Sequence, residues 1–464
     1  MSRENAISRA ESYFDDGGFT ADMARRIAIP STSQDDTGKD AVHTYLADEM
    51  VPALEAMGYT CQILPNPKAG KGPLLVGERL EDPALVTVLT YGHGDTIRGL
   101  DDLWRDGLSP WELVIEGERM YGRGIADNKG QHGINIAALG FVLAERGKLG
   151  FNSRILIETS EETGSAGLPE FCETHKDGHL AADILIASDG PRLSPERPTI
   201  FLGSRGSHQI NLELDLREGG HHSGNWGGIL ANPAIILTHA LATITDARGA
   251  IQVPEWRPPL PGSVRNAVAD LVIDGGADGP GIDEDWGEPG LTPAERVYGW
   301  NSFEILAFTA GTPERPVNAV PPKAKAFCQL RSVVGTDAAD IVPALRRHLD
   351  REGFSMVKVS EGREDQFEAS RLNPDDPWVI WAAKSVETTT AQAPAILPNL
   401  GGSLPNHLFS DILGLKTIWV PHSYSACSQH APNEHMLAPI AREGLRIMTG
   451  LFWDLGEKGI PAGS

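Results

Sequence analysis

The stretch RILIETSEETGSAGLPEF, residues 154–171, contains the transition that decides the fold of this chain. RILIET (154–159) is an aliphatic run that predicts a buried strand, and LPEFCETH (168–175) predicts a helix. Between them stand two adjacent carboxylates, Glu161 and Glu162, which repel each other unless a positive group neutralises them. The stretch therefore predicts a β–α unit and raises the question of what cation lies at its junction.

The same alternation of strand and helix flanks this stretch on both sides. ALVTVLTYGHGD (84–95) and ADILIASDG (182–190) are apolar runs that predict strands. NKGQHGINIAALGFVLAERG (128–147) has apolar residues at helical spacing and ends in glycine. This pattern predicts the α/β class, with a mostly parallel sheet flanked by helices. The polar residues of interest follow the strands, at the carboxyl ends where open α/β sheets bind their ligands.

The pattern changes near residue 207. HQINLELDLREGG alternates apolar and polar residues, as a half-exposed antiparallel strand does, and two helix-like and three further strand-like segments follow it. After Pro374 the α/β alternation returns. We therefore expect an α/β domain split into residues 1–206 and 374–464, with a smaller α+β two-layer domain inserted at 207–373.

Charge and composition exclude several classes of partner. The net charge of -23 and the pI near 5.0 argue against binding to nucleic acid or to an anionic membrane surface. The four cysteines form no CxxC pair, which disfavours both a disulfide framework and a thiolate zinc site. The first residues contain no apolar core of a secretory signal, and no apolar run is long enough to span a bilayer. We therefore expect a cytoplasmic protein.

Five stretches place histidine or carboxylate side chains where a hydrophobic core would not. Each has an ordinary explanation on its own, as a turn residue, an N-cap or a wet surface. Together they would converge on one edge of one sheet, because four of them follow strand-like runs. The stretches are YGHGDT (His93, Asp95), YGRGIADNKG (Asp127), SEETGS (Glu161, Glu162), IASDG (Asp189) and SQHAPNEH (His430, Glu434).

Converging carboxylates without cations would carry a severe cost in repulsion and desolvation. Imidazole nitrogen and carboxylate oxygen are the ligands that Zn²⁺ and similar divalent ions take when no thiolate is present. Two histidines with several carboxylates suffice for two metal ions that share one bridging carboxylate. Such a centre activates water and polarises a carbonyl group.

These residues resemble a family of di-zinc peptidases and amidohydrolases. The family contains aminoacylase, the bacterial glutamate carboxypeptidase, carnosine dipeptidases, acetylornithine deacetylase and succinyl-diaminopimelate desuccinylase. The resemblance runs from ARRIAIPSTS (24–33) to HAPNEH (430–435), with the motifs in the family's order. It implies a zinc-exopeptidase-like catalytic domain and two divalent metal ions per subunit, zinc first, with manganese or cobalt as alternatives.

The resemblance also implies roles for individual residues. The metal-ligand positions fall into two groups that share Asp127: His93, Asp127 and Asp189 for one ion, and Asp127, Glu162 and His430 for the other. Glu161 matches the general base, and Asp95 matches the carboxylate that orients His93. Glu162 would thus face a cation, while Glu161 would stay free to handle a proton.

The predicted insert resembles the family's lid and dimerisation domain, which implies a homodimer. HHSGNWGG matches the family element HSG..GG, so His222 corresponds to the histidine that reaches the active site of the other subunit and stabilises the oxyanion. We interpret His221 as structural.

Three further motifs imply contacts with the substrate. FCQLR supplies Arg331, which in relatives holds the substrate carboxylate, although an arginine at a strand end also suits a surface ion pair. PVNAVPP supplies Asn318, which equally suits a turn before the prolines. NLGGSLP matches a loop that contacts the substrate backbone, with Gly402 and Ser403 as the candidates.

The leading hypothesis is a metal-dependent hydrolase that cleaves a peptide or amide bond of a small substrate, a dipeptide or an N-acyl amino acid. The runner-up is an N-acyl-amino-acid deacylase or desuccinylase, or an aromatic amide hydrolase. A non-catalytic metal-binding relative is disfavoured because Glu161 and all five ligand positions are present. A nucleotide-binding oxidoreductase is disfavoured because no strand is followed by GxGxxG.

Overall fold

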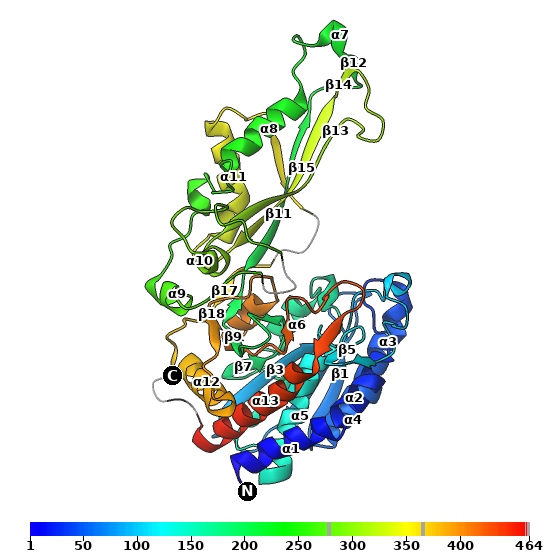
Figure 1. Ribbon diagram of the computed structural model, residues 1–464, viewed down its shortest axis with the longest axis vertical. Helices are drawn as coiled ribbons and strands as arrows, with labels where there is room; N and C mark the ends of the chain where they lie inside the picture. Colours follow the sequence, from blue (N-terminus) through cyan, green and yellow to red (C-terminus); the bar gives the residue numbers. More distant parts are fainter. Residues whose placement is uncertain (276–279, 363–366, 460, 462–464) are drawn as a thin grey trace.

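The computed structural model describes residues 1–275, 280–362, 367–459 and 461. Residues 276–279 and 363–366 of the predicted insert, and residues 460 and 462–464 of the last predicted segment, lie outside the described part. Two main sheets lie one above the other in Figure 1.

The larger sheet has eight strands in the order β1-β2-β6-β3-β7-β19-β9-β18. Its central strands β6, β3, β7 and β19 are parallel to one another, and antiparallel β2 and β1 extend one edge. This confirms the predicted mainly parallel α/β sheet. Its strands are β1 (Thr60–Leu64), β2 (Leu74–Arg79), β3 (Thr87–His93), β6 (Asn152–Glu158), β7 (Ile184–Ala187), β9 (Thr199–Phe201), β18 (Ala395–Leu397) and β19 (Lys416–Trp419).

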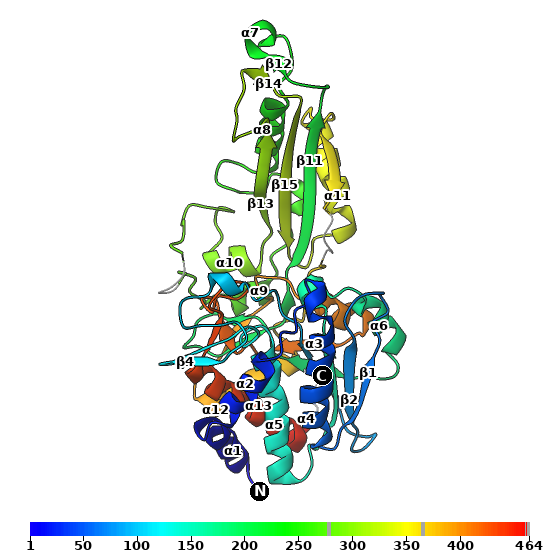
Figure 2. The ribbon, with the colours of Figure 1, turned by 90° about the vertical axis from the view of Figure 1, so that its right-hand side faces the viewer.

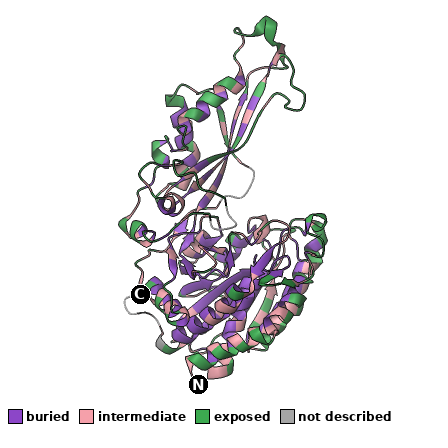
Figure 3. Ribbon diagram, in the orientation of Figure 1, coloured by how far each residue is buried: buried purple, intermediate pink, exposed green. Residues whose placement is uncertain are grey.

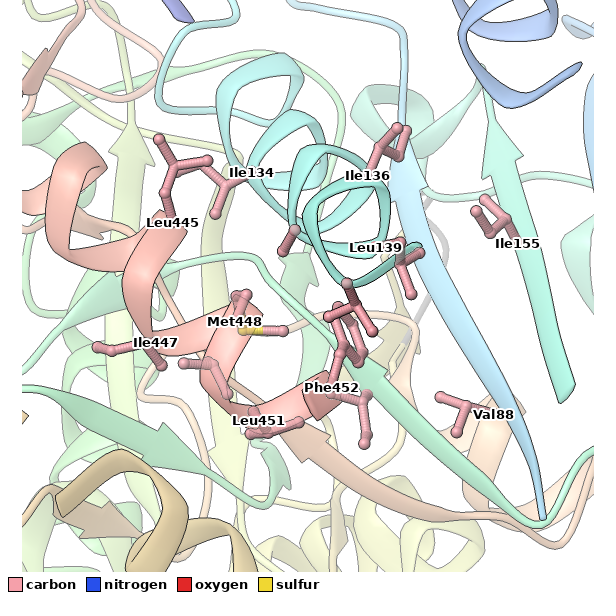
Figure 4. Packing of buried hydrophobic residues seen from close by; sticks show 14 of the residues in the cluster. Val88, Ile134, Ile136, Leu139, Ile155, Leu445, Ile447, Met448, Leu451 and Phe452 are labelled. Carbon is pink, nitrogen blue, oxygen red and sulfur yellow. The ribbon is translucent and has the colours of Figure 1, made fainter. Parts of the chain in front are cut away.

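Helices cover both faces of this sheet, because successive residues of its central strands point to opposite sides and both sides are apolar. Val88 and Ile155 pack against the layer of α5 and α13, as Figure 4 shows, while Leu89 and Leu156 pack on the side of α6. The helices of this part are α1 (Arg3–Asp15), α2 (Gly18–Ile27), α3 (Lys39–Thr44), α4 (Val51–Glu55), α5 (Lys129–Arg146), α6 (Leu168–His175), α12 (Pro377–Thr390) and α13 (Ala438–Lys458).

The smaller sheet is antiparallel, in the order β13-β15-β11-β16. Alternate residues of β11 are buried, from Gly206 to Leu214, and Ile210, Leu212 and Leu214 pack with α8 and α11 in a separate core. The opposite face of the sheet carries polar residues such as Arg331 and Gln329, which alternate along β15 with the buried Cys328 and Leu330. The elements are β11 (Gly206–Asp215), β13 (Ser302–Ala310), β15 (Lys323–Ser332), β16 (Lys358–Glu361), α8 (Pro233–Ile244) and α11 (Ile341–Arg351).

The far tip of the smaller sheet is a short exposed subdomain. There β12 (His221–His222) pairs with β14 (Ala319–Val320), and α7 (Ser223–Trp226) follows directly. Figures 1 and 2 both place this tip at the end of the molecule opposite to the larger sheet, and Figure 3 shows its mostly exposed surface.

The remaining elements lie around the junction of the two sheets. Two short helices, α9 and α10, belong to the predicted insert, yet Val268, Leu271 and Tyr298 pack in the core of the larger sheet. These elements are α9 (Gly262–Ala267), α10 (Pro293–Tyr298), β10 (Gly203–Ser204) paired with β17 (Ser370–Arg371), β20 (Ser423–Tyr424) paired with β8 (Pro191–Arg192), and the sheet of β21 (His435–Leu437), β5 (Arg119–Tyr121) and β4 (Val114–Glu116). Among the described helices, none combines the length and the apolar character needed to span a membrane.

Candidate metal centre

The carboxyl ends of three parallel strands bring the sequence-predicted ligands together. His93 is the last residue of β3, which pairs with β6 and β7. Glu161 and Glu162 follow β6 in a single 3₁₀ turn, and Asp189 follows β7 by two residues. Asp127 lies just before α5. Parallel strands end at one edge, so these side chains share one location.

Two groups of ligand atoms share Asp127. In the first group, His93 Nε2 lies 3.0 Å from Asp127 Oδ1 and 3.7 Å from Asp189 Oδ2. In the second, His430 Nε2 lies 2.9 Å from Asp127 Oδ2 and 3.0 Å from Glu162 Oε2. The two oxygens of Asp127 therefore face different histidines.

The arrangement suits divalent cations. Within each group the ligand atoms lie within 4.8 Å of one another. Asp189 Oδ2 is buried and has no hydrogen-bond partner among the described residues, which is costly for a carboxylate oxygen unless a cation contacts it. The donors are imidazole nitrogens and carboxylate oxygens, the set that zinc and its neighbours take. The residues present thus fit a metal site.

The electrostatics of the cluster lead to the same conclusion. Hydrogen bonds to Asp127 and Glu162 raise the pKa of His430 to about 11. Burial first, and then the neighbouring Asp127, raise the pKa of Glu162 to about 7 and that of Asp189 to about 6. The cluster therefore retains protons near neutral pH when no cation is bound, and metal binding would release them.

Asp95 organises the acidic turn. Its carboxylate oxygens accept hydrogen bonds from the backbone N–H groups of Glu161 (3.2 Å) and Glu162 (3.1 Å), and from Ser33 Oγ at 2.6 Å. Asp95 contacts His93 mainly through its backbone, because His93 Nδ1 lies 3.1 Å from the Asp95 carbonyl oxygen and 3.5 Å from Asp95 Oδ1. Asp95 thus positions His93 mainly through its backbone carbonyl group and the two glutamates through its carboxylate.

Glu434 joins the two loops that carry Asp127 and His430. It is fully buried, accepts hydrogen bonds from the backbone N–H groups of Gly124, Ala126 and Asp127 at 2.9–3.1 Å, and pairs with Arg123 at 2.8 Å. The sequence pattern placed Glu434 among the candidate carboxylates but indicated no role for it. Its signal was its position four residues after His430.

Two amide side chains near Asp127 had no signal in the sequence pattern. Gln429 Nε2 donates to Asp127 Oδ2 at 2.7 Å. Asn128 Nδ2 donates to the Ser188 carbonyl oxygen at 2.9 Å, and its Oδ1 lies 2.9 Å from His132 Nδ1. These contacts restrain Asp127 and the residue that follows it.

The cluster lies at one wall of a cavity of about 1850 Å³. The other wall is formed by the polar face of the smaller sheet and by the loop after β18. There Arg331 Nη1 donates to Ser403 Oγ at 2.7 Å. Asp127, Glu161, Glu162, Asp189, His430, Arg331, Gly402 and Ser403 all line the cavity.

His222 and Asn318 do not join this site. His222 is exposed at the far tip, where its Nδ1 accepts a hydrogen bond from the Gly224 N–H at 3.1 Å. Asn318 lies beside it, since its carbonyl oxygen accepts from the Ser223 N–H at 2.8 Å. Within one chain, these two predicted site residues lie side by side, but the length of the smaller sheet separates them from the candidate metal ligands (Figure 1).

Comparison with known proteins places this geometry in a family. Residues 89–454 match peptidase family M20/M25/M40. The chain is 31% identical over 468 residues to the Beta-Ala-His dipeptidase of Homo sapiens, with 95% of this chain and 86% of that protein covered. It is 23% identical over 451 residues to the Cys-Gly metallodipeptidase DUG1 of Saccharomyces cerevisiae, with 90% of this chain and 91% of that protein covered.

Solved structures show the same fold. The crystal structure of human carnosine dipeptidase 1 matches with a TM-score of 0.74 and 22% identity, over 98% of this chain and 100% of that chain. The structure of the di-peptidase Dug1p from Saccharomyces cerevisiae matches with a TM-score of 0.78 and 22% identity, over 98% and 99%. The resemblance inferred from the motifs is confirmed. The chain belongs to peptidase family M20/M25/M40 and is a metal-dependent hydrolase of peptide bonds.

Proposed function

We propose that this hydrolase is a dipeptidase with two divalent metal ions in each subunit. The observation that carries the proposal is Asp127, which is shared by two ligand groups at one wall of a cavity whose other wall presents Arg331. The relatives named dipeptidases support the small peptide substrate. The proposal includes the division into catalytic segments 1–206 and 374–464 and a lid at 207–373.

Each metal ion would have its own histidine. His93 and Asp189 would hold one ion, His430 and Glu162 the other, and Asp127 would bridge them. Zinc suits this donor set, and manganese or cobalt are alternatives. When bound, the ions supply Lewis-acid polarisation of the scissile carbonyl and lower the pKa of a water molecule.

Glu161 would be the general base. It lines the cavity, and no described residue donates a hydrogen bond to its carboxylate, whereas Glu162 accepts one from the Ile97 N–H at 3.2 Å and contacts His430. A carboxylate that is free of protein donors can accept a proton from the attacking water and deliver it to the leaving amine. Adjacent positions in the chain keep both glutamates within reach of the same reacting group.

Arg331 would bind the anionic end of the substrate. Its side chain donates to Ser403 Oγ and to Gln329 Oε1, and among the described residues no carboxylate lies within ion-pair distance of it. A guanidinium held by neutral groups keeps its charge available for a carboxylate, which it can bind through two parallel hydrogen bonds. Gly402 and Ser403 would contact the substrate backbone from the same wall.

A second copy of the chain would complete the site. His222 and Asn318 lie at the tip, away from the metal ligands of their own chain. Strand β13 is at an edge of the smaller sheet, and Ile305, Leu306 and Phe308 on it are 48%, 57% and 40% exposed. An unpaired edge with exposed apolar residues is a suitable surface for pairing with another copy. We therefore propose a homodimer in which His222 donates to the developing oxyanion in the other subunit.

The compartment proposed for this enzyme is the cytoplasm. All four cysteines are free thiols, and Cys172, Cys328 and Cys427 are buried. Free thiols are the usual state in a reducing compartment.

A substrate panel tests the proposed function. We expect the zinc-loaded protein to hydrolyse dipeptides with a free carboxyl terminus faster than N-acetyl and N-succinyl amino acids, as measured by release of the free amino acid. A matched set of dipeptide amides tests the role of the carboxylate. Preferential hydrolysis of N-acyl amino acids would favour the deacylase alternative, and no hydrolysis of any compound by protein with full metal content would contradict the proposal.

A further inference from the structure

Arg205 lies where the chain passes from the larger sheet into the smaller one, between β10 and β11. Its side chain holds two distant segments. Nε donates to the Gly401 carbonyl oxygen at 2.9 Å, and Nη1 donates to the Val297 carbonyl oxygen, in the last turn of α10, at 3.4 Å. The side chain of Arg205 therefore connects the junction of the two sheets to helix α10 and to residues 400–403, the loop after β18.

The backbone of Arg205 fixes the same loop. Its N–H donates to the carbonyl oxygens of Leu400 and Gly402 at 3.3 and 3.2 Å, and its carbonyl oxygen accepts from Ser403 Oγ at 2.7 Å. Ser403 Oγ in turn accepts the 2.7 Å hydrogen bond from Arg331 Nη1. Ser403 is thus the link through which Arg205 sets the position of the cavity-lining guanidinium.

The charges in this region are unbalanced. Within the described ranges, no carboxylate lies within ion-pair distance of Arg205 or of Arg331. Burial first, and then the like charge of Arg331, lower the pKa of Arg205 to about 10. Glu304 on β13 offsets part of the repulsion between the two arginines from beyond ion-pair distance, and a bound anion would relieve the rest.

Gly401, Gly402, Ser403 and Arg331 line the cavity, whereas Arg205 lies behind them and is not among the described lining residues. We propose that Arg205 is a positioning residue for the anionic end of the substrate, which it serves by holding the loop 400–403 and Arg331 in place and by adding a second positive charge behind them. The inference rests on the proposed function, because that function supplies the substrate carboxylate.

The test compares a dipeptide with its C-terminal amide. The binding measurements use zinc-loaded protein with Glu161→Gln, a substitution that slows turnover. The dissociation constants of the dipeptide and of its amide are measured by calorimetry, in this variant and in the same variant with Arg205→Met added. We expect Arg205→Met to weaken binding of the dipeptide about 10- to 100-fold, because the loop that carries Ser403 and supports Arg331 loses the hydrogen bond of a charged group. Binding of the amide should change far less. Without the Glu161 substitution, KM for the dipeptide should rise while kcat stays within about threefold, since the lost interaction acts on substrate binding.

Two further variants separate positioning from general damage. Arg205→Lys keeps the charge but loses the planar donor geometry, so it should restore part of the preference for the carboxylate. Arg371→Met is the matched control. Arg371 pairs with Gly203 in the adjoining two-stranded ladder and is not a described lining residue of the cavity. It should leave the preference unchanged.

The possible results separate a failure of the role proposed for Arg205 from a failure of the proposed dipeptidase function. Equal weakening for dipeptide and amide, or wild-type affinity for both, would overturn the role of Arg205, as would a wild-type protein that binds dipeptide and amide equally. If the wild-type protein binds the dipeptide in preference to the amide and this depends on Arg205, but no hydrolysis occurs, the inference holds and the proposed function fails. If Arg205→Met does not fold, Arg205→Lys decides between the same outcomes.

Discussion

Asp127 and the glutamate pair show how single side chains divide the chemistry of this site. Asp127 directs one carboxylate oxygen to His93 and the other to His430. Glu162 is occupied on both oxygens, by the Ile97 N–H and by His430, whereas Glu161 receives no hydrogen bond from a described donor. Under the proposed function, these two chemically identical neighbours would act differently, Glu162 as a ligand and Glu161 as a base.

The separation of these roles can be tested by one substitution. Glu161→Gln keeps the size of the side chain but cannot accept a proton, so we expect turnover to fall at least ~10²-fold. The metal content of Glu161→Gln, measured by inductively coupled plasma mass spectrometry, should stay at the wild-type level. The matched variant Glu162→Gln should lose metal. The reverse pattern would show that the two roles are exchanged.

At the level of secondary-structure elements, the metal centre depends on a contact between two loops that are far apart in sequence. The loop before α5 and the loop before β21 are joined by Glu434, which is buried together with Arg123. A buried carboxylate that accepts several backbone N–H groups fixes the path of the backbone around the ligands. The strand ends thus place His93, Glu162 and Asp189, while this loop contact places Asp127 and His430.

We expect Glu434→Gln to weaken metal binding about 10- to 100-fold, the range found when groups that support metal ligands are changed. It should also lower the free energy of unfolding by about 3–5 kcal/mol, because Arg123 keeps a buried charge without a counter-charge. Competition with a chelator measures the first effect and urea denaturation the second. Glu443→Gln is the matched control, because Glu443 on α13 forms an ion pair with Arg192 of β8 but belongs to neither group of ligand atoms; it should leave metal affinity unchanged. Equal metal affinities for both variants would contradict this account.

The sequence predicted the elements whose hydrophobic pattern is strong. Strands β3, β6 and β7 and helix α5 follow from apolar runs and helical spacing, and they carry His93, Asp189 and the glutamate pair to one edge. The role of Glu434 did not follow, because it depends on a loop contact across 307 positions that no periodicity encodes. The packing of α9 and α10 on the larger core was also missed, since short helices in a Pro- and Gly-rich stretch have too few apolar residues to form a pattern.

At the level of the whole molecule, the two sheets place the tip and the metal centre at a distance that one chain does not bridge. Figures 1 and 2 show the tip with β12 and α7 beyond the far end of the smaller sheet. Motifs alone could not reveal this separation, because it is set by the length and direction of β11 and β15. A homodimer would bring the tip of one subunit to the cavity of the other.

Mixing two inactive variants tests the shared site. We expect His222→Ala and Glu161→Gln each to lose about 10²- to 10³-fold in turnover. In a heterodimer of the two, one of the two sites combines an intact Glu161 with an intact His222 from the other subunit, so activity should reappear after subunit exchange. The control is the mixture before exchange. Absence of recovery despite demonstrated exchange, or full activity in a strictly monomeric enzyme, would contradict the dimer.

The measurement that tests the central claim most directly is the number of metal ions per chain. Protein purified without chelator, equilibrated with zinc and freed of unbound metal, is analysed by plasma mass spectrometry against an accurate protein concentration. A centre bridged by Asp127 predicts about two ions per chain, because each histidine has its own set of ligand oxygens. A value at or below one, with no gain on adding manganese or cobalt, would contradict the account.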